Sequence, residues 1–173
     1  ALGYAGIADV YTLLATTLQS RMPADEAMPK AKTAAQKAIQ LDPNLSEAYV
    51  SLAWIKFRFD WDWTGAEKDF QKAIELNPNN AQAHQWYSEL LATLRREEQS
   101  IAEVKKAHEL EPFNILMHWN YAKNLIDFKR YKEALVEAKK VYEMDPNFRR
   151  NHRVLRQAYA ANGMNAQAFE ILL

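Results

Sequence analysis

Four short segments of the chain end in an acidic or amide residue followed by proline, and they recur at an almost constant interval. The prolines that close them are separated by 35, 34 and 34 residues: Pro43, Pro78, Pro112 and Pro146. Proline lacks the N–H needed to continue a helix, and it disfavours the helical region for the residue before it. The interval therefore predicts similar units of about 34 residues, each closed by a proline.

Within each unit, apolar residues recur at helical spacing in two blocks, which predicts two amphipathic helices per unit. The eighth position of the first four units is small: Ala8, Ala53, Ser88 and Ala122. The twentieth position is also small: Ala31, Ala66, Ser100, Ala134 and Ala168. Small side chains at both positions allow the two helices to approach closely. Because one pair cannot bury its apolar face alone, neighbouring pairs are expected to stack.

This combination of period and positions resembles the tetratricopeptide repeat family along the whole chain. The resemblance implies an all-α fold, an α-solenoid in which stacked helix-turn-helix repeats form a right-handed superhelix. We expect residues 1–173 to form a single domain. Its repeats are predicted at 1–45, 46–80, 81–114 and 115–148, with a partial repeat at 149–173.

Two repeats depart from the standard length. The first has 11 extra residues around Gln19–Lys30, which we expect to form a loop between its two helices. Such insertions in solenoids often decorate a binding edge, and the alternative is a tolerated surface loop. The second has one extra residue in Asp60–Trp63. Thr64 and Glu67 follow it in a capping-box pattern that predicts the start of the next helix.

Composition excludes several classes of function. The chain has 22 Lys and Arg against 22 Asp and Glu, so it lacks the net positive field that favours nucleic acid or membrane surfaces. It has no cysteine, which excludes disulfides and thiolate metal sites. Its longest apolar runs, such as 48–55, are too short to span a bilayer. We therefore expect no nucleic acid or membrane partner. The resemblance to the repeat family implies protein or peptide partners, and we expect a cytoplasmic location, which the absence of cysteine allows.

Three histidines lie 34 residues apart: His84, His118 and His152. Equivalent side chains of successive repeats are about 10 Å apart, whereas the ligands of one zinc ion lie about 2 Å from it. These histidines therefore cannot share an ion in a regular stack. We interpret them as packing residues and predict no metal site and no cofactor.

His84 and Ser88 are four residues apart, which is the spacing of a nucleophile and its base on one helix face. Ser88 occupies the small packing position and should be buried. The sequence offers no third orienting group and no glycine-rich loop. We therefore predict that the chain is not an enzyme and has no catalytic residues.

The first helices of stacked repeats line a concave groove in the resembled family, mainly through positions 2, 5, 6, 9, 12 and 13. Transferred to this chain, these positions predict the following peptide-binding residues: Trp54, Phe57, Arg58, Gln85, Trp86, Trp119, Asn120, Lys123, Arg150 and Arg153. Gln82 also occupies a groove position. Large aromatics among polar residues fit a peptide groove, because aromatic and arginine anchors dominate interface energetics. The alternative is that some tryptophans belong to the core, which is most credible for Trp86.

One charge cluster stands out. From Arg149 to the end of the chain there are four arginines and one glutamate. A solvated helix face is one explanation. The other is a site for an acidic peptide, because arginine pairs bidentately with carboxylates.

We expect a scaffold that binds a peptide or helix of a partner protein in its concave groove. The Asp-Trp-Asp-Trp segment at 60–63 and the long first loop resemble repeat arrays appended to bacterial signalling and regulatory proteins, which implies a module of such a protein. The alternative is a structural spacer or a self-association module. Apolar residues at the C-terminal end predict either self-association there or further helix: Phe169, Ile171, Leu172 and Leu173.

Overall fold

A computed structural model of the chain describes residues 1–16 and 22–171, and this part contains α-helices, one short π-helix and no β-strand. The predicted all-α fold of helix-turn-helix repeats is confirmed. The chain divides into two compact units, Ala1–Leu90 and Leu91–Leu173, and the division falls within helix α5. In the described part, no helix combines the length and apolar character needed to cross a membrane.

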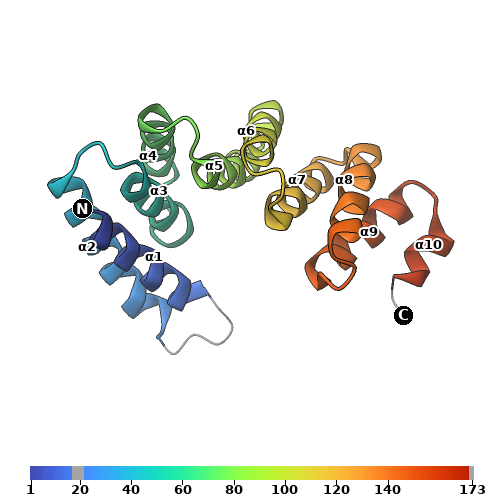
Figure 1. The fold of residues 1–173 in the computed structure, drawn as a ribbon, viewed down its shortest axis with the longest axis horizontal. Coiled ribbons are helices and arrows are strands. Elements are labelled where there is room, and N and C mark those ends of the chain that lie inside the picture. Colours follow the sequence, from blue (N-terminus) through green and yellow to red (C-terminus); the bar gives the residue numbers. More distant parts are fainter. Residues whose placement is uncertain (17–21, 172–173) are drawn as a thin grey trace. The chain divides into compact units, whose positions relative to one another are not determined.

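The first unit holds the first two repeats and the beginning of the third. Its elements are α1 (Leu2–Thr16), α2 (Ala24–Leu41), α3 (Ser46–Ile55), the π-helix η1 (Lys56–Asp60), α4 (Trp63–Leu76) and most of α5 (Ala81–Thr93). Helix α1 packs along α2, and α3 packs along α4 (Figure 1).

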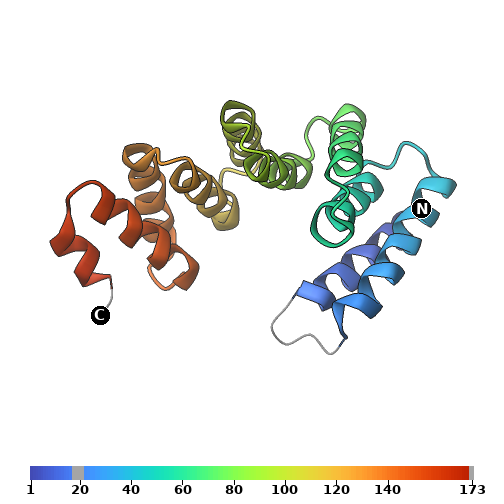
Figure 2. The ribbon, with the colours of Figure 1, turned by 180° about the vertical axis from the view of Figure 1, so that it is seen from behind.

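The second unit continues the same arrangement. Its elements are the end of α5, then α6 (Glu97–Leu110), α7 (Ile115–Asp127), α8 (Tyr131–Met144), α9 (Arg149–Ala161) and α10 (Asn165–Glu170). Helix α7 packs on α8, and α9 packs on both α8 and α10 (Figure 2).

The proline steps end the second helix of each repeat as the sequence predicts. Asp42, Asn77 and Asp145 precede the prolines, and their φ angles of −148°, −141° and −153° lie in the extended region. Each side chain also accepts a hydrogen bond from the backbone N–H two residues later, at 3.0, 3.1 and 2.9 Å. This short turn holds the chain out of the helix until the next one begins.

The first helix of each of the last three repeats ends in a left-handed residue at an equivalent position. The φ angles are 60° at Arg95, 63° at Lys129 and 77° at Gly163. In each case the next N–H bonds to the carbonyl oxygen five residues earlier: Arg96 to Leu91 at 2.9 Å, Arg130 to Leu125 at 2.8 Å and Met164 to Tyr159 at 3.0 Å. This geometry satisfies carbonyls that the helix end would leave without partners.

The alanines at positions eight and twenty of the first, second and fourth repeats are all fully buried: Ala8, Ala31, Ala53, Ala66, Ala122 and Ala134. Ala122 and Ala134 pack in one core of the second unit together with Leu125 and Leu155, as the sequence predicts. In the first repeat the predicted pair is not formed, because Ala8 packs with Ala34 and Ala35, whereas Ala31 packs with Met28 and Ile55.

The prediction of a loop at 19–30 is wrong for its second half, which is helical. Residues 17–21 lie outside the described residues, but α2 already begins at Ala24 and continues through Pro29. Ala27 and Met28 are buried, so helix formation covers apolar surface that a loop would leave exposed. Asp25 and Glu26 lie in the first turn, where negative charge complements the helix dipole.

The predicted capping box at Thr64 and Glu67 is also wrong. Helix α4 begins at Trp63, and its N-cap is Asp62, two residues before Thr64: the Asp62 carboxylate accepts a hydrogen bond from Gly65 N at 2.9 Å. A Cβ at position 65 would force this carboxylate to shift, so glycine permits the close approach of the cap. Glu67 instead accepts a hydrogen bond from the Tyr87 hydroxyl at 2.8 Å.

Candidate functional site

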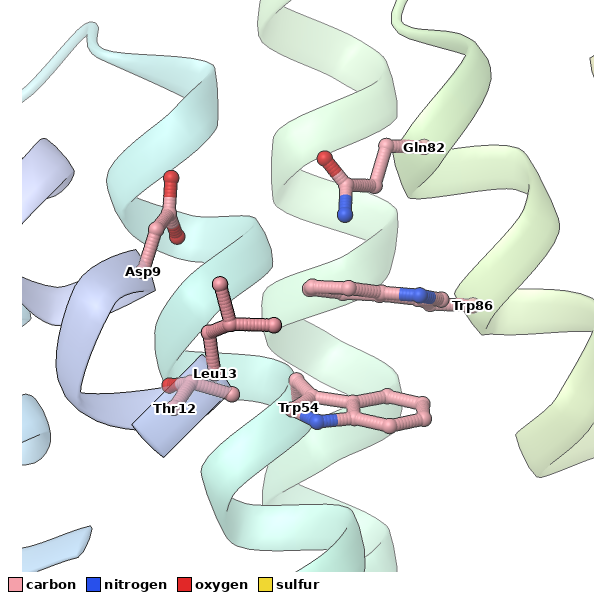
Figure 3. Close-up of a pocket in the computed structure, with 6 residues that line it drawn as sticks. All are labelled: Asp9, Thr12, Leu13, Trp54, Gln82 and Trp86. Carbon is pink, nitrogen blue, oxygen red and sulfur yellow. The ribbon is translucent and has the colours of Figure 1, made fainter. Parts of the chain in front are cut away.

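The first unit contains an open pocket of about 290 Å³, which is formed by the first helices of the first three repeats. Its lining comes from α1, α3 and α5: Asp9, Thr12, Leu13, Trp54, Gln82 and Trp86. Figure 3 shows the two indole rings stacked one over the other, with Leu13 pointing toward them and the Asp9 carboxylate across the space from Gln82. The pocket therefore combines an aromatic and aliphatic wall with two polar groups.

The aromatic wall is a stack of Trp54 and Trp86. Their ring centroids are 4.5 Å apart, and the rings are tilted by only 25°. The Trp86 side chain packs against the buried residues Val50, Ala73 and Ala83. The Arg58 guanidinium lies 5.3 Å from the centre of the Trp54 ring, within cation–π range. Both indoles remain only partly buried, so their surface is available to a ligand.

Asp9 supplies the negative charge of the pocket. Its Oδ1 accepts a hydrogen bond from the Ser51 hydroxyl at 2.6 Å. Although Asp9 keeps part of its surface exposed, desolvation of its carboxyl raises its pKa, and nearby Glu47 adds to the rise while the Ser51 bond opposes it. A cationic group of a ligand would offset both the desolvation of the Asp9 carboxylate and its repulsion by Glu47.

The structure places the sequence-predicted residues of the first unit in two groups. Trp54 and Trp86 line the pocket, and Arg58 is exposed beside Trp54. Phe57 and Gln85 are buried, with 5% and 7% of their surface exposed, so the prediction that they face a ligand is wrong.

The burial of these two residues has local causes. Phe57 lies in η1, where the wider π-helical turn absorbs the extra residue of the second repeat and changes the direction of the side chains that follow. The amide of Gln85 donates to Glu89 Oε1 at 2.7 Å along its own helix.

Three pocket residues were missed by the sequence prediction. Asp9, Thr12 and Leu13 come from the first repeat. They occupy positions 9, 12 and 13, which belong to the groove positions of the resembled family. Applying that pattern to the first repeat as well as to the later ones would have found them.

In the second unit, the predicted residues form a different arrangement. The indole N–H of Trp119 donates to the Arg150 carbonyl at 3.1 Å, and the Arg150 guanidinium lies 5.8 Å from the Trp119 ring centre. Lys123 pairs with Asp127 at 2.7 Å, while Asn120 is half-buried. Arg150 and Arg153 are exposed on α9. Trp119 thus ties α7 to α9, and the arginines remain accessible.

His84 and Ser88, which have the spacing of a nucleophile and its base, each bond to a backbone carbonyl. Ser88 is buried, and its hydroxyl donates to the Gln85 carbonyl at 2.6 Å. The His84 Nε2 lies 3.0 Å from the Pro78 carbonyl oxygen, so it bonds to the turn before its helix.

Comparison with known proteins identifies the family of one segment and the fold of the whole. Residues 69–102 match the tetratricopeptide repeat family. A structure of MamA AMB-1 is similar at 14% identity and a TM-score of 0.75, covering 98% of this chain and 91% of that one. MamA from Desulfovibrio magneticus RS-1 is similar at 14% identity and a TM-score of 0.73, covering 96% and 91%. No curated protein sequence matches the chain.

A further similar structure is YrrB, described as a tetratricopeptide-repeat protein with an unusual peptide-binding site. It is 19% identical, with a TM-score of 0.70, and the match covers 99% of this chain and 82% of that one. At these identities the structural likeness establishes the fold.

Proposed function

Because the chain is a tetratricopeptide-repeat protein, we propose that it is a protein-interaction module that binds a peptide or helical segment of a partner. The pocket around Trp54 and Trp86 is its main anchor site. The peptide-binding site of the structurally similar YrrB is consistent with this role. Within the proposal, the chain acts by holding a partner and contributes no catalytic group.

One observation carries the proposal: a stacked tryptophan pair forms the wall of an open pocket. Tryptophan is strongly enriched among the residues that dominate binding energy at protein interfaces. The pair is held by packing on one side and is only partly buried, so little ordering is needed before a ligand binds.

The lining also indicates the chemistry of the ligand. Leu13 and the indoles favour a bulky apolar side chain, since its burial removes apolar surface from water. Asp9 favours a lysine or arginine next to that side chain, and Gln82 can bond to a peptide backbone. We propose a segment in which a large apolar residue lies beside a basic one.

The exposed arginines of the second unit form a second proposed contact surface. Arg150 and Arg153 project from α9 near Trp119, and guanidinium groups bind carboxylates bidentately. This surface would bind acidic residues of a partner. We further propose that the chain serves a larger signalling or regulatory protein, on the resemblance of its Asp60–Trp63 segment and its long first loop to repeat arrays of such proteins.

Selection of peptides from a random library on the immobilised protein tests the proposal without a known partner. Selected peptides should share an apolar residue beside a basic one. Trp86→Ala should weaken their binding by about 30-fold or more, which corresponds to about 2 kcal/mol. Leu13→Ser should also weaken it; this side chain is 62% exposed, so its loss should not disturb folding.

The matched control is Trp61→Gly. It removes an exposed tryptophan outside the pocket, and its φ of 58° suits glycine. Binding should be unchanged in this variant. Equal binding by the wild type, Trp86→Ala and Leu13→Ser would contradict the proposed site.

Self-association is a second candidate function, favoured by one exposed side chain. Phe169 on α10 is 72% exposed, and a large apolar side chain in this state favours contact with another surface. Sedimentation at several concentrations should then show a dimer that Phe169→Ser abolishes. A concentration-independent monomer would contradict this candidate.

A further inference from the structure

The second unit brings two imidazoles and a carboxylate together from three successive helices. His108 comes from α6, His118 from α7 and Glu137 from α8. His108 Nε2 lies 3.0 Å from His118 Nδ1, and His118 Nδ1 lies 3.7 Å from Glu137 Oε2. One ligand atom from each residue lies within 4.8 Å of the other two. We propose that this cluster binds a divalent transition-metal ion of the Zn²⁺ class.

The hydrogen bond of His118 prepares it as a ligand. Its Nε2 lies 2.8 Å from the Pro112 carbonyl oxygen, which can only accept, so this nitrogen carries the proton and donates. In the neutral ring, Nδ1 is then unprotonated, and it lies next to His108 and Glu137. Metal-binding histidines commonly donate their second N–H to a carbonyl in this way, which orients the ring.

Glu137 has one carboxylate oxygen occupied and one available. Oε1 accepts from Lys140 Nζ at 2.9 Å. Oε2 is buried and has no hydrogen-bond partner among the described residues. A buried oxygen without a partner is unfavourable and rare. Coordination of a cation through Oε2 would compensate its desolvation, while Lys140 continues to hold the other oxygen.

Two of the three ligand separations are close to those around a shared ion, and the third, between His108 Nε2 and Glu137 Oε2, lies within 4.8 Å and would shorten when an ion binds. Two nitrogens that each lie 2.0–2.1 Å from a tetrahedral zinc ion are about 3.3 Å apart. The nitrogen–nitrogen distance here is 3.0 Å, and the nitrogen–oxygen distance is 3.7 Å. Two histidines and one glutamate leave a fourth position for water, as in open zinc sites. Coordination through His108 Nε2 requires the His108 proton to move to Nδ1, with no net release.

Metal binding requires a neutral imidazole, and the surroundings of His108 disfavour its protonated form. Burial lowers its pKa, and His118 and Lys140 lower it further, whereas Glu137 and Glu109 oppose them. The Tyr121 ring, with its centroid 5.7 Å away, covers another side of the imidazole.

The repeat architecture supplies an internal comparison. His152 lies 34 residues after His118, and its Nε2 lies 2.8 Å from the Pro146 carbonyl oxygen. The residue equivalent to His108 is Tyr142, whose ring centroid is 6.5 Å from that of His152, and the residue equivalent to Glu137 is Ile171. His152 therefore shares the fold environment of His118 but lacks both potential co-ligands.

Titration of the chelator-treated protein, made without a polyhistidine tag, tests the proposal with Zn²⁺ alone. Calorimetry should show one ion per chain, and Zn²⁺ should raise the melting temperature. Replacement with Co²⁺ should give the visible absorption of a tetrahedral site. His108→Gln and Glu137→Gln should each weaken binding by about 10-fold or more and reduce the thermal shift.

His152→Gln is the matched control and should keep wild-type affinity. Circular dichroism verifies that each variant is folded, and His108→Gln is the preferred one because His108 is only partly buried. Absence of Zn²⁺ binding to the wild type would overturn the proposal. Equal affinity in the wild type and His108→Gln would overturn it as well.

Discussion

The tryptophan pocket of the first unit and the histidine–glutamate cluster of the second arise from different parts of the repeat. The pocket uses groove positions of the first helices, where Trp54 and Trp86 keep exposed surface. The cluster uses positions at which neighbouring helices pack, and His118 there is 8% exposed. One scaffold thus presents an open aromatic pocket in one unit and a buried polar junction in the other.

The largest expected effect is the loss of stability that distinguishes a core residue from a pocket residue in the first unit. Leu52 is 7% exposed and packs with Ala8 and Ala35, so Leu52→Ala should lower the free energy of unfolding by about 2–5 kcal/mol. Trp54→Ala should cost clearly less, because part of its surface is already exposed. Chemical denaturation of both variants measures the difference. An equal loss would assign Trp54 to the core and remove the pocket from the account.

A smaller loss of stability should distinguish the environment of Trp119 from that of Trp54. Trp119 donates its indole N–H to the Arg150 carbonyl, so Trp119→Phe should lower the free energy of unfolding by about 0.5–1.5 kcal/mol. Trp54→Phe retains an aromatic ring against Trp86 and should change stability less. The same denaturation measurement applies. If Trp119→Phe were as stable as the wild type, Trp119 would be a surface residue like Trp54.

The arginine surface should affect binding more than folding. Replacing Arg150 and Arg153 by alanine should leave helicity unchanged, because both are exposed. It should reduce the salt dependence of binding to an acidic peptide, since exposed charges are screened by salt. Affinity measured at several salt concentrations decides this. An unchanged salt dependence in the double variant would leave these arginines as a solvated helix face.

The pH dependence of stability should reveal the charge in the pocket. Burial raises the pKa of Asp9 above 3.8, so its stabilising contribution is present below that pH and is lost as the pH rises through the raised pKa. Asp9→Asn cannot titrate. The stability of the wild type relative to this variant should therefore decline as the pH rises above 3.8, measured by urea unfolding at several pH values. A constant difference would show that the carboxyl is fully solvated.

The helix ends at the proline steps and the two tryptophans of the pocket could be predicted from sequence because their causes are local or periodic. Each Asp-Pro or Asn-Pro step ends a helix by its own backbone chemistry, and Trp54 and Trp86 occupy regular groove positions. Phe57 could not be placed, because the π-helix that turns it inward depends on how the extra residue of the second repeat is accommodated.

The histidine–glutamate cluster could not be predicted for a different reason. The sequence argument compared histidines at one repeat position, whereas His108, His118 and Glu137 occupy three different positions on three helices. Their meeting depends on the packing between repeats. A search for titratable residues at positions that face each other across that junction would have found them.

Fluorine NMR of the protein labelled with 5-fluorotryptophan tests the central claim, that a partner segment binds against Trp54 and Trp86. The chain has five tryptophans, at 54, 61, 63, 86 and 119, and single Trp→Phe variants assign their resonances. Titration with a selected peptide should shift the resonances of Trp54 and Trp86 and leave those of Trp61 and Trp63 unchanged. Saturable binding that leaves both pocket resonances in place would contradict the account.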